Sequence, residues 1–178
     1  MKRSLVVVTA VALVLAAAYA STRSAAAPAA PARSSSTGML RLPAAAPAGE
    51  ETLWGHIKSL RRSGKRFELR FDPALWLTGL AADRAAKQDG REVANDYYVV
   101  DESHRQLTYA VFANARVTVL TRGLRAQRIS VAELAGIVKG KNPRHRKLFD
   151  AHNALGFWIR IGDKYPNPAL SIDQQYQP

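Results

Sequence analysis

The chain has 178 residues, a formal net charge of +12 and no cysteine. The lack of cysteine excludes disulfides, thiolate zinc sites and a cysteine nucleophile. The excess of Lys and Arg favours polyanions or an anionic surface as partners, although the same charge can serve solubility alone.

The N-terminus has the pattern of an export signal. The apolar run 5–20 follows Lys2 and Arg3 and ends in a small-residue Ala-Tyr-Ala site. This order is typical of a secretory signal peptide, here cleaved after Ala20. The run is short for a membrane-spanning helix, which needs about 20 apolar residues, so an uncleaved membrane anchor is the alternative. We therefore expect an exported protein, either extracellular or associated with the cell envelope.

Residues 21–50 form the next compositional segment. They consist mainly of Ala, Pro and Ser and contain almost no large apolar side chain. Such a segment cannot bury enough surface to offset its ordering entropy, so it is predicted to be a disordered linker. The remaining residues, 51–178, are long enough for a single domain with its own hydrophobic core.

The first half of this domain begins with a predicted hairpin. Residues 54–60 and 65–72 alternate between apolar and polar side chains, are joined by a turn at Gly64, and stop at Asp72-Pro73. A helix is expected over 75–88.

Strands are predicted next over 97–101, 107–112 and 116–121, with a turn at Asn114-Ala115 between the last two. The second helix follows Ser130 and Glu133, which have the spacing of a capping box, and it ends at Gly140. Strands over 157–161 and 169–176 complete the chain. Seven short strands and two short helices predict a mainly β (α+β) domain, a small antiparallel β-barrel related to the OB fold, with a plain α+β sandwich as the alternative.

Catalytic motifs are absent from the sequence. It contains no GxSxG elbow, no HExxH zinc motif and no glycine-rich phosphate loop. The four histidines lack ligand spacing, so we expect no metal and no cofactor. Asp96, Asp101 and Glu102 lie close enough in sequence to suggest a pair of carboxylates for hydrolysis. They also lie at predicted strand ends and turns, where acidic residues occur because their side chains stabilise turns.

Three basic clusters are candidates for a binding surface: 58–66, 122–128 and 139–147. If they converge, their charge density would hold an anionic polymer or a membrane surface. Nucleic acid fits poorly with export, and no small-molecule substrate is evident. The residues selected from these clusters are Arg61, Arg62, Lys65, Arg122, Arg125, Arg144 and Arg146. A second candidate patch, facing a ligand through aromatic rings, consists of Asn95, Tyr97 and Trp158.

Three segments resemble motifs of a known family. They are 71–82 (FDPALWLTGLAA), 95–99 (NDYYV) and 172–178 (IDQQYQP). Together they resemble a family of small uncharacterised exported domains of high-GC Gram-positive bacteria, in which a signal or lipobox and a low-complexity tether precede the domain. The resemblance implies no activity, cofactor or catalytic residue, and this chain lacks the lipobox cysteine of the lipidated members.

These observations leave three hypotheses for function. The first is an exported, non-catalytic binding domain that contacts an anionic envelope component or a partner protein. The second is an exported hydrolase that uses carboxylates near Asp96 and Asp101. The third is a structural envelope protein whose strands pair with another chain.

Overall fold

A computed structural model describes residues 43–93, 95–101, 105–149 and 156–177. The predicted signal peptide and most of the predicted linker lie outside the described residues. No helix in the described ranges is long and apolar enough to cross a membrane.

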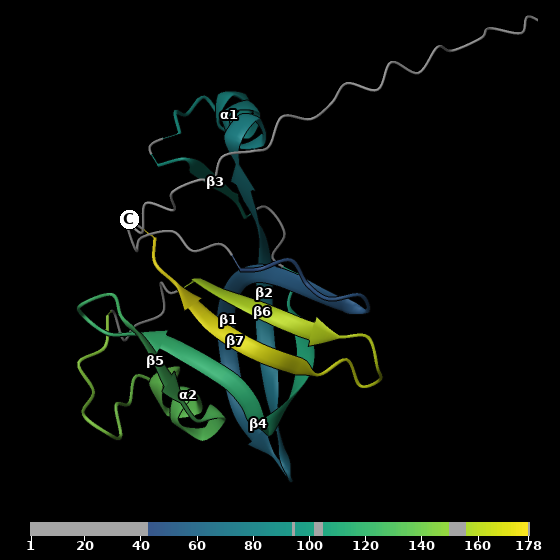
Figure 1. Ribbon diagram of the computed structural model, residues 1–178, viewed down its shortest axis with the longest axis vertical. Coiled ribbons are helices and arrows are strands. Elements are labelled where there is room, and N and C mark those ends of the chain that lie inside the picture. The colour runs from purple at the N-terminus through teal and green to yellow at the C-terminus, as the bar shows by residue number, and fades with distance from the viewer. Residues whose placement is uncertain (1–42, 94, 102–104, 150–155, 178) are drawn as a thin grey trace, which may run out of the picture. The chain divides into compact units, whose positions relative to one another are not determined.

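Strands dominate the described part of the chain, with two short helices between them (Figure 1). In chain order the elements are β1 (Glu50–Ser63), β2 (Arg66–Thr78), α1 (Gly79–Gln88), β3 (Tyr97–Val100), β4 (Leu107–Leu120), β5 (Ala126–Ile129), α2 (Val131–Ile137), β6 (Gly156–Gly162) and β7 (Ala169–Gln175).

Five of these strands close into a β-barrel, which confirms the predicted fold class. Around the barrel the order is β1-β2-β4-β7-β6, and β6 pairs with β1 to complete the circle. All neighbours are antiparallel except β4 and β7, which are parallel. A parallel pair requires a long crossover connection, and here β5, α2 and β6 lie between the two strands. This order, with a helix between the third and fourth barrel strands, is that of the OB barrel.

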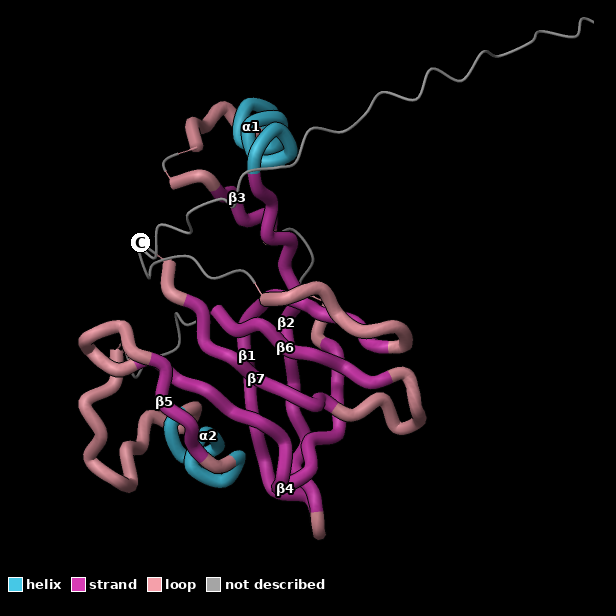
Figure 2. Tube along the Cα trace, viewed as in Figure 1, coloured by secondary structure: helices cyan, strands magenta, loops and turns pink. Residues whose placement is uncertain are grey.

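The barrel interior is filled by the apolar residues that alternate along the strands. Phe67, Leu69 and Phe71 of β2 are buried, whereas Arg66, Glu68 and Arg70 between them are exposed. Helix α2 lies against the barrel beside β4 (Figure 2) and adds Leu134 and Ile137 to the core. The core side chains at or below 1% exposure are Leu60, Leu69, Phe71, Val111, Val117, Val131, Leu134, Ile159, Ala169 and Ile172.

Strand β2 does not stop at Asp72-Pro73 as predicted, but continues to Thr78. Its first part pairs with β1 and β4, and Leu75–Thr78 pairs instead with β3. Residues 75–78, predicted as the first turn of a helix, are therefore strand, and α1 begins only at Gly79. The end of β2, β3 and α1 form an arm that extends beyond the barrel (Figure 2).

Strand β4 is continuous through the turn predicted at Asn114-Ala115. The strand changes partner around this segment: Leu107–Val111 pair with β2, whereas Val111 and Arg116–Thr118 pair with β7, with a register shift between Val111 and Arg116 in the β7 pairing. A polar, small-residue segment thus marks a bend in a barrel strand and not a reversal of the chain. Strand β5 was missed because the basic residues around it suggested a loop.

Candidate functional site

A groove of about 460 Å³ crosses the outer face of β1, β6, β7 and the second half of β4, and we call it the four-strand groove. Its position follows from strand alternation, because Ile159 and Ile172 point into the core and their neighbours therefore point outward. Loop residue Leu124 and residues 43–44, which precede β1, also line it.

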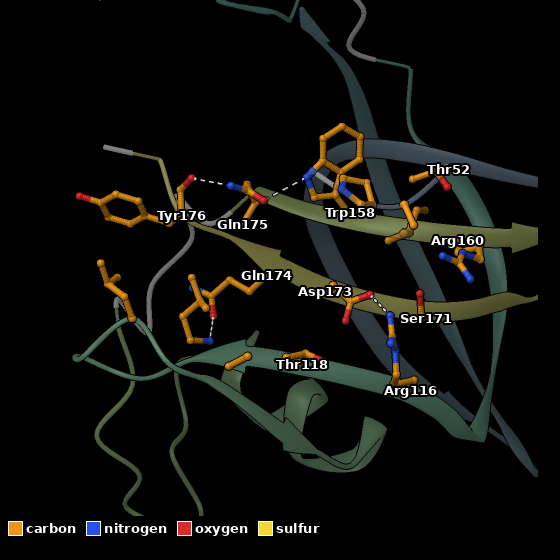
Figure 3. Close-up of a pocket in the computed structure, with 16 residues that line it drawn as sticks. Thr52, Arg116, Thr118, Trp158, Arg160, Ser171, Asp173, Gln174, Gln175 and Tyr176 are labelled. Carbon is orange, nitrogen blue, oxygen red and sulfur yellow. Dashed lines mark hydrogen bonds and ion pairs between the residues drawn. The ribbon is translucent and has the colours of Figure 1, made fainter. Parts of the chain in front are cut away.

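Register places polar side chains side by side across this groove. Arg160 of β6 pairs with Ser171 of β7, which in turn pairs with Arg116 of β4. The next row holds Trp158, Asp173 and Thr118 in the same way. The result is a floor of hydroxyl, carboxylate and guanidinium groups bounded by an indole ring (Figure 3).

Ion pairs and hydrogen bonds hold several of these side chains in place. Arg116 Nη2 donates to Asp173 Oδ2 at 2.8 Å, and the two side chains point toward one another in Figure 3. Trp158 Nε1 donates to Gln175 Oε1 at 3.2 Å. Because partners fix their orientation, the groove is largely formed before any ligand arrives.

An aromatic cluster lies beside the groove, next to Trp158. Trp76, from the arm, stacks flat on Tyr97 with ring centroids 4.1 Å apart and an interplanar angle of 7°. The Trp76 ring also lies 5.2 Å from that of Trp54 and 6.0 Å from that of Trp158. Trp54 packs against Gly156, where a Cβ atom would lie 2.3 Å from its ring. The cluster therefore joins the arm to the outer wall of the barrel.

The segments 71–82, 95–99 and 172–178 each supply an aromatic ring to this region. Trp76 comes from 71–82, Tyr97 from 95–99, and Tyr176, which lines the groove, from 172–178. Burial raises the pKa of the Tyr97 phenol, and the nearby Tyr176 phenol raises it further. The Tyr97 ring thus stays a neutral hydrogen-bonding group at ordinary pH.

The predicted aromatic patch is partly assembled. Tyr97 and Trp158 both contact Trp76, whereas Asn95 is exposed and forms an isolated bridge with Tyr97. Trp76 was missed as a site residue because its segment was predicted to be helical. The signal that could have found it is the recurrence of aromatic residues in the same three segments that suggested the family.

The basic residues fall into two places. The Arg122 amide donates to the Lys147 carbonyl at 2.9 Å, so the loops that carry the second and third clusters are neighbours. Arg125 lies between groove residues Leu124 and Ala126. We call Arg122 and Arg125 the rim of the groove. Arg61, Arg62 and Lys65 lie instead at the end of the β1–β2 hairpin. The structure therefore joins two of the three clusters.

Two of the selected arginines already have an acidic partner. Arg146 Nε donates to Glu133 Oε1, and Arg144 Nε lies 3.6 Å from Glu133 Oε2. Glu133 is buried, so these arginines bind the loop to α2 and contribute less positive charge to a ligand.

The carboxylates predicted for hydrolysis do not form a pair. Asp96 and Asp101 are exposed and flank the four-residue strand β3 at opposite ends. Five residues of strand span roughly 16 Å, beyond the separation of about 5–9.5 Å that glycosidase carboxylates require. Glu102 and His104 lie outside the described residues. Within the described ranges no group of three His, Asp or Glu side chains could hold a metal ion.

Comparison with known proteins gives no relative: no family model, no curated protein and no solved structure matches the chain. The OB assignment therefore rests on strand order and pairing alone.

Proposed function

We propose that this protein is an exported, non-catalytic binding domain that holds an anionic glycan of the cell envelope in the four-strand groove. The observation that carries the proposal is the groove itself, a preformed hollow with a tryptophan wall and a floor of polar side chains. Barrels of this type use an open face to bind oligosaccharides and oligonucleotides.

The chemistry of the groove favours a sugar polymer. A sugar ring presents an apolar C–H face, which packs on an aromatic ring such as Trp158, and hydroxyl groups, which hydrogen-bond to planar polar groups. Ser171, Asp173 and Gln175 supply such groups from one strand, on its outward face.

The charge of the rim favours an anionic polymer. Asp173 offsets Arg116 within the groove, and Glu50 lies 3.5 Å from Arg160, so the floor is close to neutral. The excess positive charge lies on the rim, where Arg122 and Arg125 are exposed. Exposed cations attract a polyanion over distance and make its binding sensitive to salt. The predicted signal peptide favours an envelope polymer over nucleic acid.

Binding to glycans of different charge tests this function. Residues 37–178 form one compact unit and can be used alone. We expect this unit to bind isolated cell envelopes and polygalacturonate. It should bind neutral dextran more weakly than polygalacturonate, and it should not bind anionic phospholipid vesicles more strongly than polygalacturonate. Trp158→Ala should weaken polygalacturonate binding about tenfold, since stacking on an aromatic ring contributes about 1–3 kcal/mol. The double variant Arg122→Ala/Arg125→Ala should make the salt dependence shallower.

Tyr165→Ala is the matched control, because Tyr165 is 95% exposed and does not line the groove. Its binding should equal that of the unchanged protein. Absence of binding to any glycan at low salt, or equal affinities for the Trp158→Ala and Tyr165→Ala variants, would overturn the proposal. Stronger binding to vesicles than to polygalacturonate would do the same.

A further inference from the structure

The chain folds back over its own groove just before β1. The Glu50 amide donates to the Pro47 carbonyl at 3.0 Å, and the Asp163 amide donates to the Gly49 carbonyl at 3.0 Å. Gly49 has a φ of +80°, which glycine adopts without strain. This anchored turn reverses the chain, so that residues 43–46 lie over the outer face of β1.

Beneath this segment is a second hollow of about 290 Å³, which we call the tryptophan hollow. Residues 43–46 line one side of it, and Thr52, Trp76, Thr78 and Trp158 line the other. An extended Pro-Ala-Ala-Ala segment therefore lies against two indole rings. Aromatic-lined grooves bind proline-rich segments in this manner, because such segments are already extended before they bind.

Polar atoms around the tryptophan hollow lack partners. Thr52 Oγ1, Trp54 Nε1 and Trp76 Nε1 are buried and have no hydrogen-bond partner among the described residues. Trp54 is only 2% exposed. A buried donor without an acceptor costs about 1–3 kcal/mol, and the segment as it lies in the structure leaves both indole N–H groups unpaired. A polyproline-type chain offers free carbonyls, because it forms no internal hydrogen bonds.

We propose that the tryptophan hollow is a docking site for an extended proline- and alanine-rich peptide, and that residues 43–46 of this chain are its occupant. Docking covers the indole rings of Trp76 and Trp158 with the small apolar side chains of the segment. The linker has a second segment of the same composition at 28–31 (PAAP), which can compete for the hollow.

Docking also bears on ligand access, and this step rests on the proposed function. Pro43 and Ala44 line the four-strand groove as well as the tryptophan hollow, and Trp158 belongs to both. A glycan that stacks on Trp158 must therefore displace the segment or share the ring with it.

The three tryptophans of the chain are at 54, 76 and 158, so the indole N–H resonances in a ¹H–¹⁵N NMR spectrum report this region alone. The experiment compares residues 37–178 with residues 47–178, which keep the anchored turn and lose the docked segment. We expect the Trp76 and Trp158 resonances to shift on deletion. Addition of a peptide of residues 37–47 should return them to their original positions in a saturable manner.

Variants separate docking from general effects of folding. Trp76→Phe keeps an aromatic ring on Tyr97 but removes part of the indole surface that lines the hollow, and it should weaken the peptide about fivefold. A peptide with glycine in place of Pro43 and Pro47 should bind at least about fivefold more weakly, because it must be ordered on binding. Tyr165→Ala should leave peptide binding unchanged.

Indole resonances that are identical in the two lengths of chain would overturn the docking proposal. So would equal affinity for the proline and glycine peptides. Glycan binding is measured separately on the same samples. A peptide that docks while no glycan binds would disprove the proposed function and leave the docking site intact. A glycan that binds while no peptide docks would do the reverse.

Discussion

Glu133 shows how one side chain of α2 serves two parts of the molecule. Its amide donates to Ser130 Oγ at 3.1 Å, which confirms half of the predicted capping box. Its carboxylate does not turn back to the Ser130 amide, as a full capping box requires, but binds Arg146 of the following basic loop. The local half could be predicted from spacing, whereas the partner 13 residues away could not.

Removal of this charge should loosen the basic loop. Glu133→Gln keeps the shape of the side chain but leaves Arg146 without its carboxylate, and hydrogen bonds to charged groups contribute about 1.5–3 kcal/mol. We expect a loss of about 2 kcal/mol in the free energy of unfolding, measured by urea denaturation. Glu68→Gln, at an exposed position of β2, is the control and should change stability by less than about 0.5 kcal/mol. Equal effects of the two variants would contradict a role for the buried ion pair.

At the scale of the elements, β1 and β2 are in close contact where β2 leaves β4. The last β2–β4 pair is Phe71 with Leu107, and Pro73 lies beyond it, opposite Gly55 of β1. Proline has no N–H to donate, so it fits a position with strand pairing on one side only. Pro73 therefore marks a change of partner and not, as predicted, the end of the strand.

Gly55 is required by this close approach. A Cβ atom at that position would lie 2.1 Å from the Asp72 carbonyl oxygen and 2.8 Å from the Pro73 Cα atom, both of them backbone. Gly55→Ala should therefore force β1 and β2 apart and lower the free energy of unfolding by about 3 kcal/mol or more. Gly123→Ala is the matched control, because nothing lies within 4 Å of its added Cβ atom. Thermal unfolding of both variants checks this, and a Gly55→Ala protein as stable as the control would contradict it.

The strands of the barrel could be predicted better than the site. Alternation predicts the second strand of the hairpin, 65–72, and the last two strands, because burial of one face imposes a period of two on the sequence. The four-strand groove depends instead on register between distant strands, which joins Thr52 of β1 to Arg160 of β6 and Arg116 of β4 to Ser171 of β7. Register is set by closure of the barrel as a whole, so no local pattern indicates it.

The position of Trp76 in the arm also depends on tertiary pairing that the local sequence does not indicate. The segment 75–88 has helical composition, yet residues 75–78 are held as strand by pairing with β3. Tertiary pairing overrides local propensity here, as it commonly does for short segments. The consequence for the site is large, because strand geometry is what lays Trp76 flat on Tyr97.

At the scale of the whole molecule, tyrosines of the barrel and the arm resist ionisation. Burial raises the pKa of Tyr97 and of Tyr109, with a smaller increase from Tyr176 and Glu51 respectively. Tyr98 donates its hydroxyl proton to Asp89 Oδ2 at 2.6 Å, and this hydrogen bond raises its pKa. All three shifts are in the same direction, so they add in their effect on the stability of the fold.

Stability should therefore fall at alkaline pH. The folded protein holds the phenolic protons of these tyrosines above pH 10, where the unfolded chain releases them. Because the unfolded state then binds fewer protons than the folded state, the free energy of unfolding decreases as pH rises through about 10 and is unaffected by these groups below about 9. Tyr109→Phe removes one contributor and should make this decrease shallower in urea denaturation. Tyr165→Phe, at a side chain that is almost fully exposed, should leave the slope unchanged. A Tyr109→Phe slope equal to that of the unchanged protein would show that burial in the barrel does not set the alkaline limit of the fold.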